Sequence, residues 1–153
     1  MELKGILEID LNGKNLLIIG CPASGKTWLS WLLKRDSHQL IHTDDYIFQG
    51  YEMGMYGALN ATVCSVKNTI VEGVLGYRML RKGAEYGNYY PDIVIEIKTP
   101  EHQAIKIYSK ERDAKKIKYL QQFNSSHEKI LSEYKKMVPQ DLIPTWIEFY
   151  NEH

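Results

Sequence analysis

Residues 15–27 read NLLIIGCPASGKT. The first five form a short apolar run of the kind that makes a strand buried on both faces of a sheet. The next eight match the pattern G-x-x-x-x-G-K-[ST] at every fixed position, and leucines at helical spacing follow within residues 26–35. The stretch therefore predicts a strand, a glycine-rich loop and a helix, the context in which this pattern binds the phosphates of a nucleotide.

Each residue type in this loop has a chemical reason. The glycines let the backbone curl so that successive N–H groups point at phosphate oxygens, and the start of the helix adds the positive end of its dipole. Lys26 is expected to reach the β and γ phosphates, and Thr27 to bind Mg²⁺ through its hydroxyl. The predicted nucleotide-binding residues are Gly20, Cys21, Pro22, Ala23, Ser24, Gly25, Lys26 and Thr27, among which Cys21 is interpreted as a small filler.

Further strands and helices alternate along the chain. Apolar runs at 39–42, 68–72 and 92–97 predict three more strands, and residues 52–66 and 75–86 predict helices between them. This alternation indicates a parallel sheet with helices on both faces. Residues 101–137 have a helical pattern with an expected break at Asn124-Ser125-Ser126, and 126–153 is expected to be a helical tail without a strand. Trp28 and Trp31, three apart in the first helix, are expected to lie in the core.

Composition limits the class of protein. A chain of 153 residues is the size of one domain, so 1–153 is interpreted as a single unit. Lys plus Arg and Asp plus Glu both number 19, which excludes a strongly basic nucleic-acid coat, although residues 101–136 carry nine basic and five acidic side chains. Two cysteines cannot form a disulfide framework or a metal quartet. No apolar run could cross a membrane and no export signal opens the chain, so a cytoplasmic protein is expected, in the host cytoplasm if its source is viral.

The fate of the bound phosphate depends on residues outside the loop. A motor ATPase needs an apolar strand that ends in Asp-Asp or Asp-Glu, and a GTPase needs an Asn-Lys-x-Asp base reader, and neither pattern is found. Instead, Thr43-Asp44-Asp45-Tyr46 follows the second predicted strand, at the sheet edge where ligands of such folds bind. A carboxylate there can accept the proton of an attacking hydroxyl. The alternative interpretation is a helix cap with a solvated acid.

The loop, Asp44-Asp45-Tyr46 and Glu72-Gly73 together resemble small P-loop kinases, above all the adenylate-kinase-related FlaR-like proteins. Kinase domains of polynucleotide kinases carry the same Asp-Asp-Tyr with the first Asp as base, which implies Asp44 as the base here. Residues 70–81, IVEGVLGYRMLR, also resemble bacteriophage kinases that phosphorylate 5-hydroxymethyluracil within DNA.

The resemblance implies a P-loop NTPase fold, a three-layer α/β/α sandwich with a parallel sheet of four or five strands in the core order 2-3-1-4. It implies ATP and Mg²⁺ as cofactors, a helical lid at about 101–123, and Arg112 as the lid cation that stabilises transition-state charge. The chain departs from the family in two respects. No fifth strand is evident, and Arg112 stands among lysines where the family has two or more lid arginines. The alternative for Arg112 is a surface ion pair.

Four residues are candidates for binding an acceptor: Asp45, Glu72, Arg78 and Arg81. Glu72 ends the third strand and could also hold Mg²⁺ through water; the alternative is a cap on the next helix. Arg78 and Arg81 lie three apart on one helical face and could clamp a phosphate; the alternative is a solvated face. His38 and His42 flank the second strand and are interpreted as satisfied edge residues.

Together these patterns predict an ATP-dependent phosphotransferase with Lys26, Asp44 and Arg112 as catalytic residues. The expected acceptor contains a nucleoside, either a nucleotide or a modified base in DNA, and accepts the γ-phosphate on a hydroxyl or phosphate. The rival interpretation is a nucleotide-binding or hydrolysing regulatory protein without an acceptor.

Overall fold

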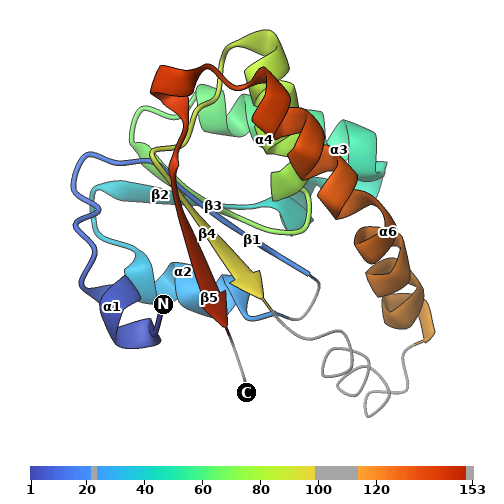
Figure 1. Cartoon of the computed structure of the whole chain (residues 1–153), viewed down its shortest axis with the longest axis horizontal. Coiled ribbons are helices and arrows are strands. Elements are labelled where there is room, and N and C mark those ends of the chain that lie inside the picture. Colours follow the sequence, from blue (N-terminus) through green and yellow to red (C-terminus); the bar gives the residue numbers. More distant parts are fainter. Residues whose placement is uncertain (22–23, 99–113, 151–153) are drawn as a thin grey trace.

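A computed structural model describes residues 1–21, 24–98 and 114–150 of the chain. Its helices and strands, labelled as in Figure 1, begin and end as follows in chain order: α1 (Leu3–Leu7), β1 (Leu16–Gly20), α2 (Lys26–Leu33), β2 (His38–His42), the 3-10 helix η1 (Thr43–Gln49), α3 (Tyr51–Val63), β3 (Asn68–Glu72), α4 (Gly76–Tyr86), β4 (Ile93–Lys98), α6 (Ala114–Met137), the 3-10 helix η2 (Gln140–Leu142) and β5 (Thr145–Tyr150).

The five strands form one parallel sheet in the order β2-β3-β1-β4-β5. Strand β1 lies in the middle and all five of its residues are buried, which explains its unbroken apolar sequence. The expected core order 2-3-1-4 is confirmed. The carboxyl ends of β1, β2 and β3 meet at one edge of the sheet, so the glycine-rich loop, η1 and the β3–α4 turn all begin there.

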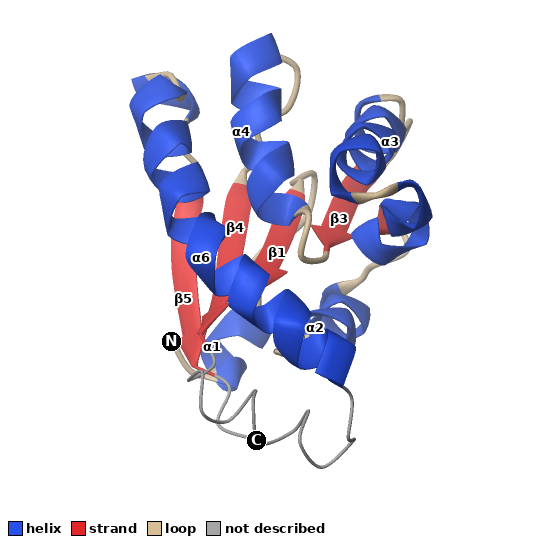
Figure 2. Cartoon of the chain, turned by 90° about the vertical axis from the view of Figure 1, so that its right-hand side faces the viewer, coloured by secondary structure: helices blue, strands red, loops and turns tan. Residues whose placement is uncertain are grey.

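Helices cover both faces of the sheet. Helices α3, α4 and α6 lie on one face and α1 and α2 on the other (Figures 1 and 2). Alternate residues of β1 supply both cores: Leu17 and Ile19 pack towards α3, α4 and α6, whereas Leu16 and Ile18 pack towards α1 and α2. The expected three-layer α/β/α sandwich is therefore the observed fold.

The helical tail expected over 126–153 is helical up to Met137, where α6 ends, but it is wrong for residues 145–150, which form β5, parallel to β4. This edge strand alternates between its faces: Ile147 and Phe149 are buried beside the α1 and α2 layer, and Glu148 between them is exposed. Its hydrogen-bonding partner is about fifty residues away along the chain. The pairing that makes this segment a strand is therefore not a local property of its sequence.

The expected helix break at Asn124-Ser125-Ser126 is also wrong, since α6 is continuous. The Ser126 hydroxyl and the His127 Nδ1–H both donate to the Phe123 carbonyl, at 3.4 and 3.0 Å, so these polar groups are satisfied inside the helix. The rings of Phe123 and His127 then pack against Tyr77 of α4, which favours continuing the helix over breaking it.

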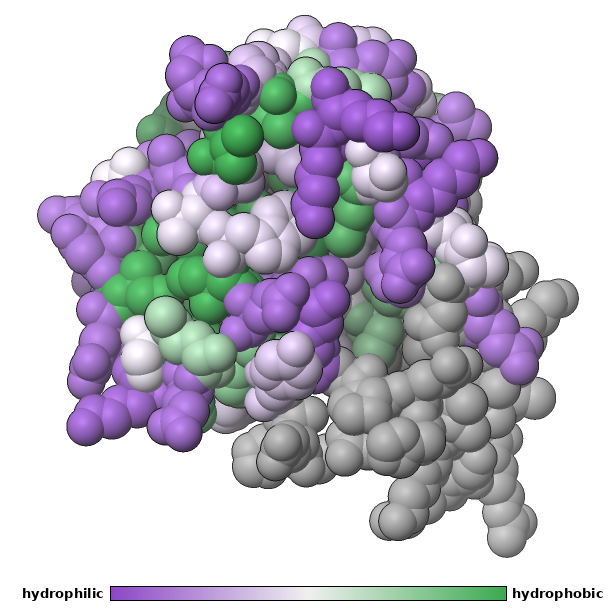
Figure 3. All heavy atoms as spheres, in the orientation of Figure 1, coloured by the Kyte–Doolittle hydropathy of each residue, from purple (hydrophilic) through white to green (hydrophobic). Residues whose placement is uncertain are grey.

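The surface differs from expectation at the first helix after the loop. Trp28 and Trp31, expected in the core, are 44% and 61% exposed, because α2 turns Leu29 and Leu33 towards the sheet. Figure 3 shows hydrophilic residues over most of one molecular face, with small hydrophobic patches between them. Among the described residues, no helix combines the length and apolar character needed to cross a bilayer.

Candidate active site

The glycine-rich loop predicted to bind phosphate connects β1 to α2. Gly20 ends β1 so close to the Ser24 hydroxyl that a Cβ there would lie 2.6 Å from its oxygen. Gly25 precedes α2 with a φ of 95°, a left-handed conformation that favours glycine. Both fixed glycines of the pattern thus have a steric reason. Pro22 and Ala23 lie outside the described residues.

Lys26 turns back into this loop. It is 7% exposed, and its Nζ donates to the Cys21 carbonyl at 2.7 Å and to the Ser24 hydroxyl at 3.4 Å. Burial lowers the pKa of Lys26, while the charges of Cys21, Glu72 and Asp44 oppose that shift. A phosphate group in the loop would offer this ammonium stronger, charge-assisted acceptors than a backbone carbonyl does.

Three side chains meet beside Lys26 at the carboxyl edge of the sheet. The Thr27 hydroxyl donates to Glu72 Oε1 at 3.0 Å, and His42 Nδ1 lies 2.7 Å from the same oxygen. Glu72 is 3% exposed, so its carboxylate is held almost entirely by protein groups. The alternative interpretation of Glu72 as a cap for the next helix is not what is found, since α4 begins without a side-chain cap.

Thr27 and Glu72 are chemically suited to Mg²⁺. The threonine hydroxyl uses its single hydrogen on Glu72, which leaves its lone pairs for a cation, and both residues offer the oxygen ligands that this ion prefers. Within the described parts of the chain, no group of three or more His, Cys, Asp or Glu side chains could hold a metal. Such a sparse site fits Mg²⁺, which proteins usually bind through one or two side chains together with substrate phosphates.

Asp44 and Asp45 lie in the first turn of η1, directly after β2, and both are exposed. Asp44 is near enough to Lys26 for its charge to favour the ammonium form. The side chain before them, Thr43, is fully buried. This anchor holds the start of η1 against the sheet while the two carboxylates remain open to solvent.

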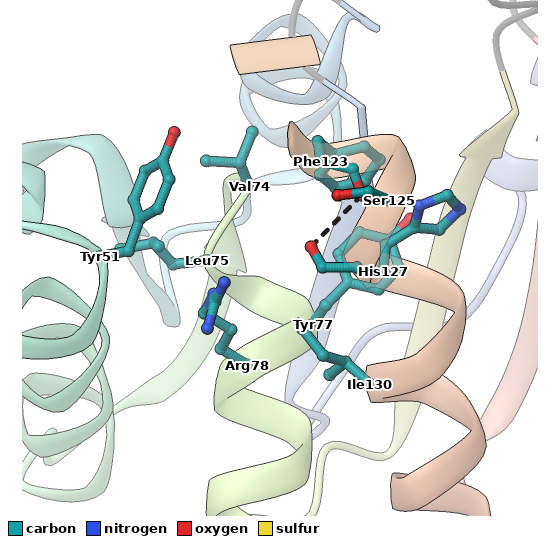
Figure 4. Close-up of a pocket in the computed structure, with 10 residues that line it drawn as sticks. Tyr51, Val74, Leu75, Tyr77, Arg78, Phe123, Ser125, His127 and Ile130 are labelled. Carbon is teal, nitrogen blue, oxygen red and sulfur yellow. Dashed lines mark hydrogen bonds between the residues drawn. The ribbon is translucent and has the colours of Figure 1, made fainter. Parts of the chain in front are cut away.

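A pocket of about 370 Å³ opens between α3, α4 and α6. Figure 4 shows Tyr51 on one side, residues of α6 on the other, and Arg78 of α4 between them. The Arg78 guanidinium lies 5.9 Å from the centre of the Tyr51 ring, and the Phe123 and His127 rings stack with centres 4.6 Å apart. The pocket is lined by Tyr51, Val74, Leu75, Tyr77, Arg78, Phe123, Ser125, Ser126, His127 and Ile130.

Tyr77 joins this pocket to a buried acid that the sequence analysis missed. Its hydroxyl donates to Glu96 Oε2 at 3.4 Å, and burial, with Glu96 adding to it, raises the pKa of Tyr77. Glu96 is 4% exposed in the middle of β4 and also accepts from Trp146 Nε1 at 3.2 Å and Lys98 Nζ at 3.3 Å. The sequence signal for this site was Glu96 itself, the one acidic residue within the apolar strand β4.

The structure brings some of the predicted residues together and separates others. Lys26, Thr27, Asp44 and Glu72 gather around the loop. Arg78 lines the pocket, but the Arg81 guanidinium lies 2.7 Å from Glu133 on α6, so the two arginines do not converge on one space. Of the expected lid at 101–123, residues 114–123 belong to α6, while Arg112 and the rest lie outside the described residues.

His42 was interpreted as a satisfied edge residue, and the sequence analysis missed its contact with Glu72. The signal was available in the alignment of two strands that both end in polar residues, His42 and Glu72, since parallel neighbours bring such ends together. His38 does have the structural role expected of it: it is 2% exposed and its Nε2 lies 3.2 Å from the Leu11 carbonyl.

No protein-family model matches this chain, and no curated protein does. Among solved structures, the chain is similar to a shikimate kinase from Acinetobacter baumannii in complex with shikimate, with a TM-score of 0.54, 15% identity, and coverage of 98% of this chain and 88% of the other. It is also similar to a possible uridine kinase from Bacillus stearothermophilus, with a TM-score of 0.47, 17% identity and 94% coverage of each chain. The chain thus has the α/β fold of P-loop kinases, with a parallel sheet in the order 2-3-1-4-5.

Proposed function

We propose that this protein is an ATP-dependent phosphotransferase that moves the γ-phosphate to a hydroxyl or phosphate of a nucleoside-containing acceptor, either a nucleotide or a modified base in DNA. The observation that carries the proposal is the pocket between α3, α4 and α6. Val74 and Leu75 follow Glu72-Gly73 directly, and Tyr51 follows the 3-10 helix that begins with Asp44 and Asp45, so both motifs lead into its walls. A nucleotide-binding or hydrolysing regulator would need no such pocket.

In this proposal, different residues of the chain bind different parts of ATP and its metal ion. The loop N–H groups and the start of α2 hold the phosphates, and Lys26 binds the β and γ groups once its ammonium leaves the Cys21 carbonyl. Thr27 and Glu72 would hold Mg²⁺, Glu72 through water. When bound, Mg²⁺ would neutralise part of the negative charge on the transferred phosphate.

Asp44 acts as the base in this proposal. It takes the proton from the acceptor hydroxyl as that oxygen forms its bond to the γ-phosphorus. The bond between the γ-phosphorus and the bridging oxygen breaks, and its electrons leave with ADP. The exposed position of Asp44 at the start of η1, close to Lys26, supports this role.

The remaining predicted residues complete the proposal. Arg78 and Asp45 contact the acceptor, and a ring such as that of Tyr51 packs against its base. Arg81 is assigned instead to the contact with Glu133. Arg112, in a lid at about 101–123, stabilises the charge of the transition state within a single domain of 1–153.

The test is an acceptor screen with γ-labelled ATP and Mg²⁺, using nucleosides, nucleotides and DNA with and without hydroxymethylated bases. Asp44→Asn should bind ATP normally and lower kcat by about 10²- to 10⁴-fold, because a positioned base contributes a factor of that size. Asp45→Asn should raise the KM for the acceptor more than it lowers kcat. Asp141→Asn, at an exposed position in η2, is the control and should match the wild type.

The outcomes separate the interpretations. Label transfer to an acceptor supports the proposal, and a steep loss of acceptor affinity with salt identifies DNA rather than a nucleotide, since each neutralised DNA phosphate releases counterions. Acceptor-independent hydrolysis would show a regulator instead. If Asp44→Asn turns over substrate at the wild-type rate, Asp44 is not the base.

A further inference from the structure

The ends of β2 and β3 bring a histidine against the acid of the nucleotide site. His42 and Glu72 are paired in the register of these neighbouring parallel strands. Side chains at paired positions project from the same face of a sheet, so the imidazole and the carboxylate lie next to each other. Their contact, from Nδ1 to Oε1, is 2.7 Å long.

The direction of both hydrogen bonds to Glu72 follows from chemistry. An ionised carboxylate only accepts, so His42 donates from Nδ1–H and Thr27 donates from its hydroxyl, both to Oε1. His42 can do so as the neutral Nδ1–H tautomer or as the imidazolium, so the contact does not depend on its charge. The imidazole is 24% exposed at the rim, beside the Trp31 ring 6.1 Å away. Two donors from different elements therefore fix the orientation of one buried acid.

The orientation of Glu72 determines whether its carboxylate stays beside Thr27 and the metal ion or turns towards the ammonium of Lys26. Glu72 also attracts the ammonium of Lys26, which must be available to phosphate. A carboxylate held by Thr27 alone would be free to turn towards Lys26, and the Thr27 hydroxyl would lose its acceptor. With His42 in place, Glu72 stays on Thr27 and the threonine lone pairs remain available to a metal ion.

We propose that His42 is a positioning residue for the Mg²⁺-binding part of the nucleotide site and acts through Glu72. The inference rests on the proposed nucleotide site but not on the identity of the acceptor. Partners that orient metal-binding residues typically change metal affinity by about 10- to 100-fold when removed.

The variants His42→Leu and His42→Asn test the role of the donor. Leucine keeps bulk at the strand end but cannot donate, whereas the amide nitrogen of asparagine occupies the place of Nδ1 along the side chain and can donate to Glu72. Gln39→Leu, an exposed change on the same strand, controls for general effects on β2. Thermal unfolding of each variant shows whether the fold is retained.

The readout is Mn²⁺ binding, followed by electron paramagnetic resonance, in the presence of a non-hydrolysable ATP analogue. His42→Leu should weaken Mn²⁺ binding by about 10-fold or more, while the affinity for the analogue in EDTA stays at the wild-type value. His42→Asn and Gln39→Leu should both bind Mn²⁺ nearly as the wild type does.

Wild-type Mn²⁺ affinity in His42→Leu would overturn the inference and leave the proposed function intact. So would equal defects in His42→Leu and His42→Asn, or a parallel loss of analogue affinity in EDTA, since each indicates a structural role. A wild-type protein that binds no Mn²⁺ with the analogue would overturn both the inference and the proposed function.

Discussion

Thr43 and Gly73 fit together at the atomic scale where β2 and β3 end. Gly73 has a φ of +144°, and a Cβ at this position would overlap the Thr43 hydroxyl. Thr43 Oγ1 is buried and has no hydrogen-bond partner among the described residues, so packing alone holds it there. The glycine after Glu72 is thus required by the neighbouring strand end, and it sets the direction in which the chain leaves the acid.

Replacing Gly73 should therefore damage both the fold and the site. Gly73→Ala is expected to lower the free energy of unfolding by about 1–3 kcal/mol or more, through backbone strain and overlap with Thr43, and to weaken nucleotide binding by moving Glu72. Urea denaturation and ATP titration measure the two effects. Gly13→Ala is the matched control, because Gly13 also has a positive φ, of 72°, but no atom within 4 Å of the added Cβ. Equal losses in both variants would show that strain alone matters.

The two arginines of α4 should respond differently to the same substitution. Arg78→Gln is expected to raise the acceptor KM without changing stability, because Arg78 lines the pocket and has no hydrogen bond or ion pair within the described residues. Arg81→Gln should leave the KM unchanged and cost at most about 1 kcal/mol of stability, as is usual for a partly exposed ion pair such as that with Glu133. Kinetics and urea denaturation test both. A raised acceptor KM in Arg81→Gln would restore the predicted arginine clamp.

At the scale of whole elements, β5 completes the surroundings of Glu96. This acid lies in β4, and the indole N–H of Trp146 in β5 donates to it at 3.2 Å. The Lys135 Nζ of α6 lies over the Trp146 ring, 5.4 Å from its centre. The edge strand thus supplies a donor to a buried carboxylate as well as apolar cover.

Removing that donor should cost stability. Trp146→Phe is expected to lower the free energy of unfolding by about 1–3 kcal/mol, because a buried carboxylate loses one of its hydrogen bonds. Trp31→Phe is the control and should change it by no more than about 0.5 kcal/mol, since Trp31 is 61% exposed. Denaturation by urea measures both values. A cost no larger than that of Trp31→Phe would mean that Tyr77 and Lys98 satisfy Glu96 without β5.

At the scale of the molecule, two buried tyrosine hydroxyls make the free energy of unfolding depend on pH in the alkaline range. Tyr134, a residue of α6, and Tyr89, between α4 and β4, belong to the core on the α3, α4 and α6 side of the sheet, and neither hydroxyl has a hydrogen-bond partner within the described chain. Burial, with Tyr90 adding to it, raises the pKa of Tyr134 from 10.0 to about 12, and burial likewise raises that of Tyr89. The folded state therefore holds these protons more tightly than the unfolded state does.

The sign of the pH dependence follows. The stabilisation is complete below pH 10 and is lost as the pH rises towards 12, where unfolding releases a proton that the folded state retains. For Tyr134 the change is on the order of 2 kcal/mol. Tyr134→Phe should lose less stability than the wild type between these pH values, measured by urea denaturation at each pH. Tyr150→Phe, at a 58% exposed site, is the control, and identical slopes for all three proteins would contradict the assignment.

The sequence by itself determined the central strands, the glycine-rich loop between β1 and α2, and the fold class. β1 is a buried run that is apolar except for its last residue, Gly20, and the buried part of β3 is built around Ile70 and Val71. The loop pattern joins a strand to a helix within thirteen residues. Such signals are local: a strand buried on both faces is mostly apolar, and a curled loop between a strand and a helix needs glycine at fixed positions. The sequence also places Lys26, Thr27 and Asp44 at one edge of the sheet, because they follow predicted strands and the carboxyl ends of parallel strands lie at the same edge.

Tertiary structure alone decided the features that depend on distant partners. β5 is a strand because β4 is beside it, and α6 continues through Asn124-Ser125-Ser126 because its rings pack on Tyr77. Arg81 forms an ion pair with Glu133 of α6, so it does not face the same space as Arg78. The register of β2 with β3 places His42 next to Glu72. Hydrogen-bond pairing between strands, ion pairs between helices and burial in a shared core join residues far apart in the chain, so no local pattern of one segment specifies them.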